Sequence, residues 1–416
     1  MNNKSVGILI VSAVVLAAGA AVVVSRGGGE KSATGLMSKD GKAELLLPKA
    51  REQMGKIAKL RIKRGAVETV LESKEIDGKP AWVVASKGGY PAESDRVRRL
   101  IGELLEATVV EAKTAKPELY ERIGVADIDK PGSTGSLIEL SDAAGAVISG
   151  VIVGNASQAP AGGDPALQTP RYFVRRSGEA QSYLAAGNFT AGAEAMSWVT
   201  RTPFTLDMQK VKSASVTVKT EGQADQVVTV SKEKPEDGAY VLAGMPEGRE
   251  LKDEAAASRV AQGLVGISID DVAPAASVDM SKPDVVTQAV TFDGLTVTAA
   301  GAMKDGKRWW GFSAAHSEPA IAPVDEAGKT AVEAAKGVAA EINRKCGGWV
   351  YVLPEYKASV MMTKMEELLK PVEVAPPAAG PEGEGAVVPE TRPLPVEAEP
   401  VAPAPVQPPS EPAPKG

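Results

Sequence analysis

Residues 75–84 read EIDGKPAWVV, and residues 235–242 read PEDGAYVL. In both stretches an Asp-Gly pair, which is typical of a tight turn between strands, comes shortly before an aromatic and β-branched run. The two Asp-Gly pairs are 160 positions apart. The helix-type apolar patterns that follow them include Val97 and Val260, which are 163 positions apart. This nearly constant spacing predicts that the middle of the chain contains one module twice.

Each copy shows the same succession of patterns. Apolar runs at the start of each copy predict strands, and a helical pattern follows the Asp-Gly pair, at Ser94–Thr108 in the first copy and Asp253–Val265 in the second. Alternating strand pairs close both copies. A third element then combines a helix at 331–346, which has Val332, Ala335, Val338, Ala339 and Ile342 on one face, with a strand at 349–353 and a helix at 356–369.

Strand pairs with interspersed helices indicate an α+β fold of antiparallel sheets rather than a doubly wound parallel sheet. The sequence predicts six divisions along the chain. They are a transmembrane anchor at 1–26, a flexible linker at 27–44, a first α+β module at 45–205, a second α+β module at 206–320, a C-terminal helix–strand–helix element at 321–371, and a disordered tail rich in Pro, Ala and Glu at 372–416.

The amino-terminal stretch Val6–Val24 is apolar or small throughout. As a helix it spans about 28 Å, close to the hydrocarbon thickness of a bilayer. A cleaved signal peptide is the alternative, because Ala18-Gly19-Ala20 resembles a cleavage site, but the apolar run continues past it and favours an uncleaved anchor. We expect a single-pass protein of the inner membrane with most of the chain on the periplasmic side.

Composition excludes several classes of function. The net charge of −6 and a pI near 5.3 argue against a nucleic-acid partner, which requires clustered Lys and Arg. Cys346 and His316 are each the only residue of their type, so a disulfide within the chain and a multi-histidine zinc site are both impossible. We assign no catalytic residue, cofactor or metal ligand.

Two short motifs resemble parts of known functional sites, but each lacks a feature that such a site requires. Gly328-Lys329-Thr330 resembles the end of a phosphate-binding loop, but that loop needs a glycine where this chain has Pro323. Asp270-Asp271 is a pair of carboxylates, but adjacency alone does not aim two carboxylates into one pocket, so a solvated turn is expected.

Trp309 and Trp310 are the most distinctive candidates for an interaction surface. In a strand their rings point to opposite faces, with Trp310 and Phe312 on the same side. One ring therefore meets the core, and the other meets the third element or a ligand. Packing is the simpler interpretation of both rings, because aromatic residues make up only 4% of the chain.

Several stretches together resemble a family of membrane-anchored bacterial proteins known as domain of unknown function 4340. The resemblance covers about 46–371 and is carried by Leu46-Leu47-Pro48, 120–129, 136–155, 172–184, Phe292-Asp293-Gly294-Leu295 and 348–354. It implies an anchored, envelope-facing domain, often encoded beside subunits of gliding-motility-like ABC transporters. It supplies no catalytic residues.

These observations favour a non-enzymatic, membrane-anchored envelope protein, an accessory or scaffold component of an ABC-transporter-type assembly. Two alternatives remain open at this point. One is an extracytoplasmic ligand- or glycan-binding module that uses the cleft between the modules and Trp309. The other is an envelope enzyme with an unrecognised site.

Overall fold

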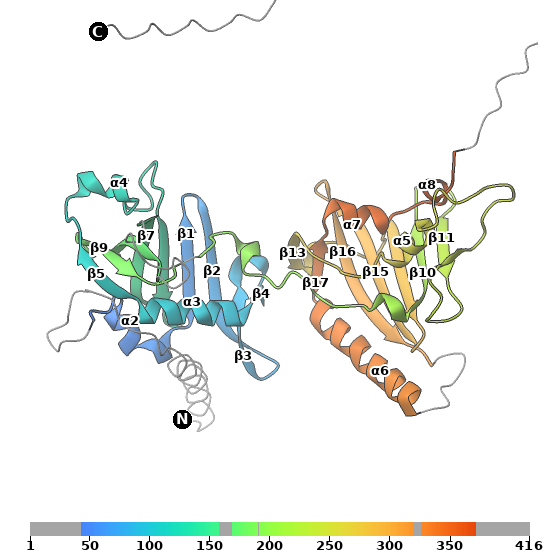
Figure 1. Cartoon of the computed structure of the whole chain (residues 1–416), viewed down its shortest axis with the longest axis horizontal. Coiled ribbons are helices and arrows are strands. Elements are labelled where there is room, and N and C mark those ends of the chain that lie inside the picture. Colours follow the sequence, from blue (N-terminus) through green and yellow to red (C-terminus); the bar gives the residue numbers. More distant parts are fainter. Residues whose placement is uncertain (1–42, 158–168, 190, 319–325, 372–416) are drawn as a thin grey trace, which may run out of the picture. The chain divides into compact units, whose positions relative to one another are not determined.

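The computed structural model describes residues 43–157, 169–189, 191–318 and 326–371. In these residues two antiparallel sheets are accompanied by a few helices, which confirms the α+β class (Figure 1). The predicted anchor at 6–24 and the predicted tail at 372–416 lie outside the described residues. Within the described ranges, no helix has the length and apolar character needed to cross a membrane.

The first sheet has nine strands in the order β4-β3-β2-β1-β6-β7-β8-β9-β5. Its strands are β1 (Lys59–Arg64), β2 (Val67–Ile76), β3 (Lys79–Val84), β4 (Tyr90–Pro91), β5 (Thr108–Ala112), β6 (Ser136–Ser141), β7 (Val147–Ala156), β8 (Arg171–Arg176) and β9 (Ser182–Ala186). The helix α3 (Ser94–Glu106) lies between β4 and β5 in the chain and buries the apolar face that its sequence predicts, namely Val97, Leu100, Ile101, Leu104 and Leu105.

The second sheet has eight strands in the order β12-β11-β10-β14-β15-β16-β17-β13. Its strands are β10 (Val211–Val218), β11 (Gln226–Ser231), β12 (Val241–Leu242), β13 (Asp271–Pro274), β14 (Val285–Thr291), β15 (Leu295–Lys304), β16 (Lys307–His316) and β17 (Trp349–Val352). The helix between β12 and β13 is α5 (Ala256–Ala261), which is shorter than the predicted Asp253–Val265.

The two strand orders match one for one when β4 is set aside. In both sheets the strand after the helix, β5 or β13, crosses to the far edge and pairs there with the last strand, β9 or β17. Two sheets with the same unusual crossover are what a duplicated module requires.

Two Asp-Gly pairs form the tight hairpin turns that their sequence favours, and a third does not. Asp77-Gly78 and Asp305-Gly306 form two-residue hairpin turns with positive φ at both residues, as an Asp-Gly pair favours. Asp237-Gly238 does not join its strands directly, because β11 ends at Ser231 and β12 begins at Val241. The Asp237 carboxylate instead accepts a hydrogen bond of 2.8 Å from the backbone N–H of Lys234 and closes a local turn.

The C-terminal element completes the second sheet instead of standing apart at 321–371. It consists of α6 (Glu326–Cys346), β17, α7 (Glu355–Val360) and α8 (Met365–Leu368), and β17 pairs with both β13 and β16. The predicted apolar face of α6 is buried except at Val338, which is 39% exposed. The helix therefore buries a narrower stripe than its sequence predicts.

A close approach between α4 (Tyr120–Ile123) and β7 depends on glycine. An added Cβ at Gly154 would lie 2.2 Å from the carbonyl oxygen of Ile123, and one at Gly135 would lie 2.5 Å from the carbonyl oxygen of Gly124. Arg175 of β8 holds the same segment, since its Nε donates to the carbonyl oxygen of Val125 at 2.9 Å. A residue larger than glycine therefore does not fit at position 135 or position 154.

Gly154→Ala should therefore destabilise the protein by about 2 kcal/mol or more, because the backbone must move to admit the methyl group. Gly102→Ala is the control. Gly102 lies within α3 with nothing near its Cβ position, so the same change should stabilise by roughly 0.5–1 kcal/mol. Chemical unfolding followed by circular dichroism measures both. Equal effects of the two variants would contradict the packing described at Gly154.

Candidate functional site

The most unusual surface of the molecule is one face of the second sheet. Successive residues of a strand point to opposite faces, and on β10, β11, β14, β15 and β16 one set is buried. On each of these strands, three neighbouring positions of the other set carry no charged side chain, which makes fifteen positions; further along the same face β15 continues with Ala302 and Lys304, and β16 begins with Lys307 and Trp309. The fifteen positions, called the uncharged array below, are Ser213, Ser215, Thr217, Val227, Thr229, Ser231, Val286, Gln288, Val290, Thr296, Thr298, Ala300, Gly311, Ser313 and Ala315.

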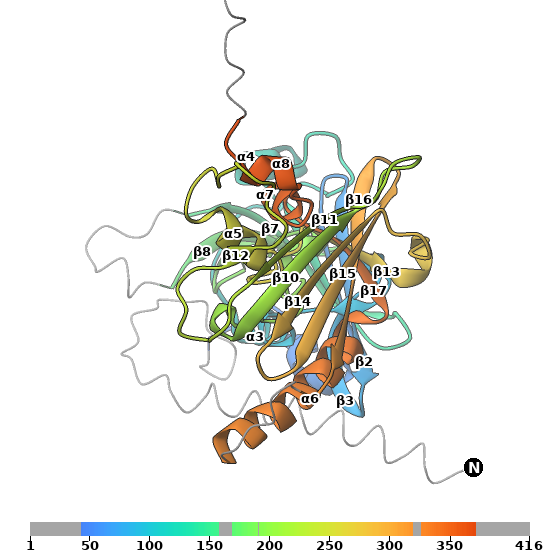
Figure 2. The same ribbon diagram turned by 90° about the vertical axis from the view of Figure 1, so that its right-hand side faces the viewer.

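The register of the strands aligns the array in three rows. The middle row runs from Thr229 through Ser215, Gln288 and Thr298 to Ser313, because each of these residues is paired with the next. The Gln288 amide donates to the Thr298 hydroxyl at 3.2 Å across this row. Figure 2 shows β10, β14 and β15 lying side by side. Gln288 is the central position of the array, since it lies on the middle row and the middle strand.

The helices of this half of the chain contact the opposite face. Thr287, which points away from the array, donates to the carbonyl oxygen of Met361 directly after α7 at 2.7 Å. Asn343 of α6 exchanges hydrogen bonds with the backbone of Ala314 and packs along β16. Lys357 of α7 donates to the carbonyl oxygens of Gln262 and Val265, which follow α5. The helices α5, α6 and α7 therefore form one layer behind the sheet.

The matching face of the first sheet is different, because it carries a ladder of ion pairs. Arg61 on β1 contacts Glu68 at 2.9 Å and Glu139 at 2.8 Å, and Lys59 contacts Glu72 at 3.2 Å. The hydrogen bond from Arg61 lowers the pKa of Glu68 below its usual range. Alternating charges of this kind keep an open sheet face in water. The two copies thus share a topology and differ in the chemistry of one face.

Trp309 and Trp310 point to opposite faces of β16, as strand geometry requires. Trp310 is fully buried, and its Nε1 finds no hydrogen-bond partner within the described residues. Trp309 is half-buried at the border of the array, where it packs with Val350 and Met280 in a small separate apolar cluster. Any interaction surface at this pair is therefore limited to the exposed part of Trp309.

The other motifs have structural roles. Gly328-Lys329-Thr330 lies in the first turn of α6, where Lys329 pairs with Glu326 at 2.7 Å. His316 ends β16, and its Nε2 lies 3.1 Å from the carbonyl oxygen of Asp293. In the ranges that the structure describes, no group of three His, Cys, Asp or Glu side chains is placed to hold a metal ion.

Asp270 is exposed in a bend, as expected, whereas Asp271 begins β13 at the junction of the two sheets. The Asp271 carboxylate accepts a hydrogen bond of 2.5 Å from Lys87, which follows β3, and Asp270 lies 3.8 Å from Arg201. Lys87 and Asp271 are 184 positions apart, so no local sequence pattern marks this ion pair. The pair connects the two copies and does not form a catalytic dyad.

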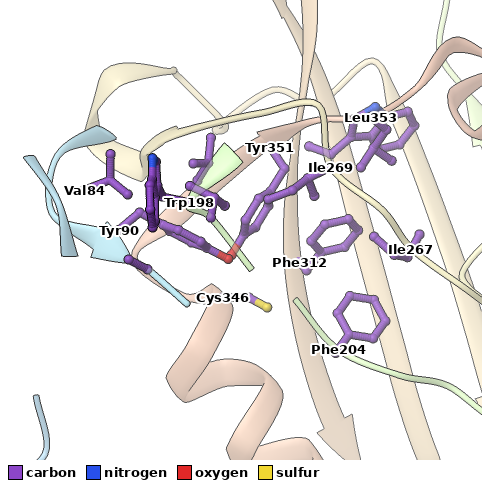
Figure 3. Close-up of a cluster of buried hydrophobic side chains, with 14 of the residues drawn as sticks. Val84, Tyr90, Trp198, Phe204, Ile267, Ile269, Phe312, Cys346, Tyr351 and Leu353 are labelled. Carbon is purple, nitrogen blue, oxygen red and sulfur yellow. The ribbon is translucent and has the colours of Figure 1, made fainter. Parts of the chain in front are cut away.

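The junction itself is filled by aromatic side chains (Figure 3). Tyr90 of β4 lies edge-on to Trp349 with ring centres 4.9 Å apart, and its ring centre is 6.1 Å from that of Tyr351. Phe312 continues the series, with its ring centre 5.4 Å from that of Tyr351 and 5.1 Å from that of Phe204. This packing joins both sheets into one hydrophobic core, so packed side chains occupy the part of the junction around Tyr90 and Tyr351.

Two shallow depressions lie on the surface of the described residues. One of about 710 Å³ lies beside the first turn of α3, and two of the three arginines that line it already have backbone partners, since Arg96 donates to the carbonyl oxygen of Ser197 and Arg98 to that of Pro80. The other, of about 390 Å³, lies between α6 and the segment Pro203–Thr205. Its lining is mostly apolar and presents no set of converging polar groups, so neither depression has the features of a substrate pocket.

The Tyr351 hydroxyl is buried beside the Tyr90 hydroxyl and the Cys346 thiol, and among the described residues no group makes a hydrogen bond of standard geometry with it. Burial raises the pKa of Tyr351 well above its usual range and the pKa of Tyr90 to about 12. Burial also raises the pKa of the Cys346 thiol. All three groups therefore stay neutral at pH 7.

Comparisons with known proteins identify a family and no described activity. The model of the family "Domain of unknown function (DUF4340)" matches residues 82–285, a range that includes α3, the strands β4 to β9 of the first sheet and the strands β10 to β13 of the second. No curated protein and no solved structure matches the chain.

Tyr351→Phe should leave stability unchanged or raise it by about 1 kcal/mol, because it removes a buried hydroxyl that makes no hydrogen bond of standard geometry with the described residues. Tyr240→Phe is the control, since the buried Tyr240 hydroxyl donates to the carbonyl oxygen of Val211 at 2.6 Å. That loss should cost about 1 kcal/mol. Urea unfolding of both variants compares them directly, and a larger loss for Tyr351→Phe would mean that its hydroxyl is hydrogen-bonded after all.

Proposed function

Because the chain belongs to the domain of unknown function 4340 family, we propose that it is a non-enzymatic accessory or scaffold component of an ABC-transporter-type, gliding-motility-like assembly in the cell envelope. In this proposal residues 6–24 anchor the chain in the inner membrane and the two modules lie on its periplasmic side. The transporter part rests on the family resemblance. The scaffold part rests on the surface of the second sheet.

The uncharged array is the observation that carries the proposal. A sheet face in contact with water normally carries charged or long polar side chains, as the first sheet does with Arg61 and Glu68. Depletion of charge is the compositional feature of the centre of a protein interface. Fifteen adjacent positions without a charge therefore fit a face that binds another protein.

The positions of the titratable side chains support a scaffold over an enzyme. Asp271 is paired with Lys87, and His316 lies against a backbone carbonyl. The aromatic packing in the junction argues in the same direction against a glycan-binding site between the modules. The half-buried Trp309 ring offers only part of its surface to such a ligand.

The proposal predicts that one charge at the centre of the array releases the protein partners. The full chain with an affinity tag should recover ABC transporter subunits from detergent-solubilised membranes of its own cells. Gln288→Glu should reduce this recovery at least tenfold, because the carboxylate loses its water on binding without gaining a counter-charge. Mass spectrometry of the recovered proteins measures the change.

Val70→Glu is the matched control. Val70 lies on the charged face of the first sheet, where it is paired with Arg61, and should tolerate a carboxylate without loss of recovery. Circular dichroism should show that both variants fold like the wild type. Equal recovery by Gln288→Glu and the wild type would refute the array as the binding surface. Partners without any ABC transporter subunit would refute the transporter part alone.

A further inference from the structure

We propose that the uncharged array binds the same array on a second copy of this chain, so that the protein forms a symmetric dimer with its second sheets face to face. The inference rests on the proposed function, because it names the first partner of the scaffold surface. It is carried by the composition of the array, by its short side chains and by its area.

Hydroxyl groups make the array complementary to itself. Eight of its fifteen positions are Ser or Thr, among them Ser215, Thr229 and Thr298 of the middle row. A hydroxyl both donates and accepts hydrogen bonds, so two such surfaces can satisfy each other without any other chemistry. A face made of carboxylates or amines alone would repel its own copy. In a symmetric dimer each contact is made twice by the same residues.

Apolar positions supply the rest of the surface. Val286 and Val290 flank Gln288 on β14, and Ala300 and Ala315 lie on β15 and β16. Most side chains of the array are short, so a second sheet can approach to about the 10 Å spacing of packed sheets. At Gly311 the Met280 methyl lies 3.5 Å from the position of an added Cβ, so Met280 borders the contact at that corner. Val227 is 52% exposed at the border of the array, and burying it adds to the contact.

Because the array carries no charge, it favours a partner surface that also carries none. A charged group of another protein placed on this face would lose water and gain no counter-charge, which costs free energy. A second array has no such group except at the rim, where Lys304 ends β15 and Lys307 begins β16. The ion-pair ladder around Arg61 on the first sheet cannot take the same place, because its charges would be desolvated against the array.

The area is sufficient for a weak, specific dimer. Five strands are about 24 Å wide, and three alternate positions on each strand extend over about 17 Å. The flat area is therefore roughly 400 Å² on each copy, and the accessible area on both copies together is on the order of 1,000 Å². An area of this size is at the lower end of specific interfaces, where weak and transient complexes are found. Anchoring both copies in one membrane would raise their effective concentration.

Sedimentation velocity of the full chain in mild detergent tests the proposal. The wild type should pass from monomer to dimer as its concentration rises through the micromolar range. Gln288→Glu and Gln288→Lys should each need at least tenfold more protein to dimerise, because like charges then face each other near the symmetry axis. An equimolar mixture of the two variants should dimerise at least as well as the wild type, since opposite charges then meet. Val70→Glu should behave like the wild type.

Two outcomes overturn the dimer. One is a wild type that stays monomeric up to about 100 µM, the highest concentration of the experiment. The other is a set of Gln288 variants that dimerise like the wild type, which would mean that another surface is used. If the wild type is monomeric but Gln288→Glu still loses its membrane partners, the dimer is refuted and the scaffold proposal stands. If the variants lose the dimer and keep their partners, the dimer stands and the scaffold surface lies elsewhere.

Discussion

The alternation of side chains along a strand is the constraint on which the rest of the molecule depends. On β10, residues such as Ala214 and Val216 must face the helices, so Ser215 and Thr217 must face away from them. The same rule applies on the four strands beside it, and the pairing brings their outward residues into rows. A slip of one residue in the register would bury the hydroxyls and expose the core. The buried face therefore fixes the composition of the open one.

Much of this fold is local and can be predicted from the sequence. The apolar spacing from Val97 to Leu105 defines α3, because five residues on one helical face can be buried only against the sheet. Asp77-Gly78 and Asp305-Gly306 define hairpins, because both residues adopt positive φ. The array could also be detected in part, since the outward residues of each strand lack charge. Only the register shows that these short segments form one surface.

The features that sequence reasoning missed are those made by distant residues. The pairing of Lys87 with Asp271 and the edge-on contact of Tyr90 with Trp349 have no local pattern, because each partner is ordinary in its own segment. The placement of β17 was missed for a similar reason. Its sequence predicts a strand, but only the position of β13 at the far edge shows where that strand inserts. Val338 was misassigned because α6 contacts the sheet along a narrow stripe.

The far-edge position of β5 and β13 also determines the order in which the chain can fold. β13 ends at Pro274, yet its neighbour β17 begins only at Trp349. During synthesis from the amino terminus, β13 therefore waits unpaired until the last strand and the helix before it have emerged. In the first sheet β5 likewise joins the sheet only through β9, although Thr108 and Val109 can pair earlier with the segment at Glu44 and Leu45. Contacts between such distant segments slow folding, because a long loop must close before they form. The sheet of each module can therefore be completed only after its last strand has been synthesised.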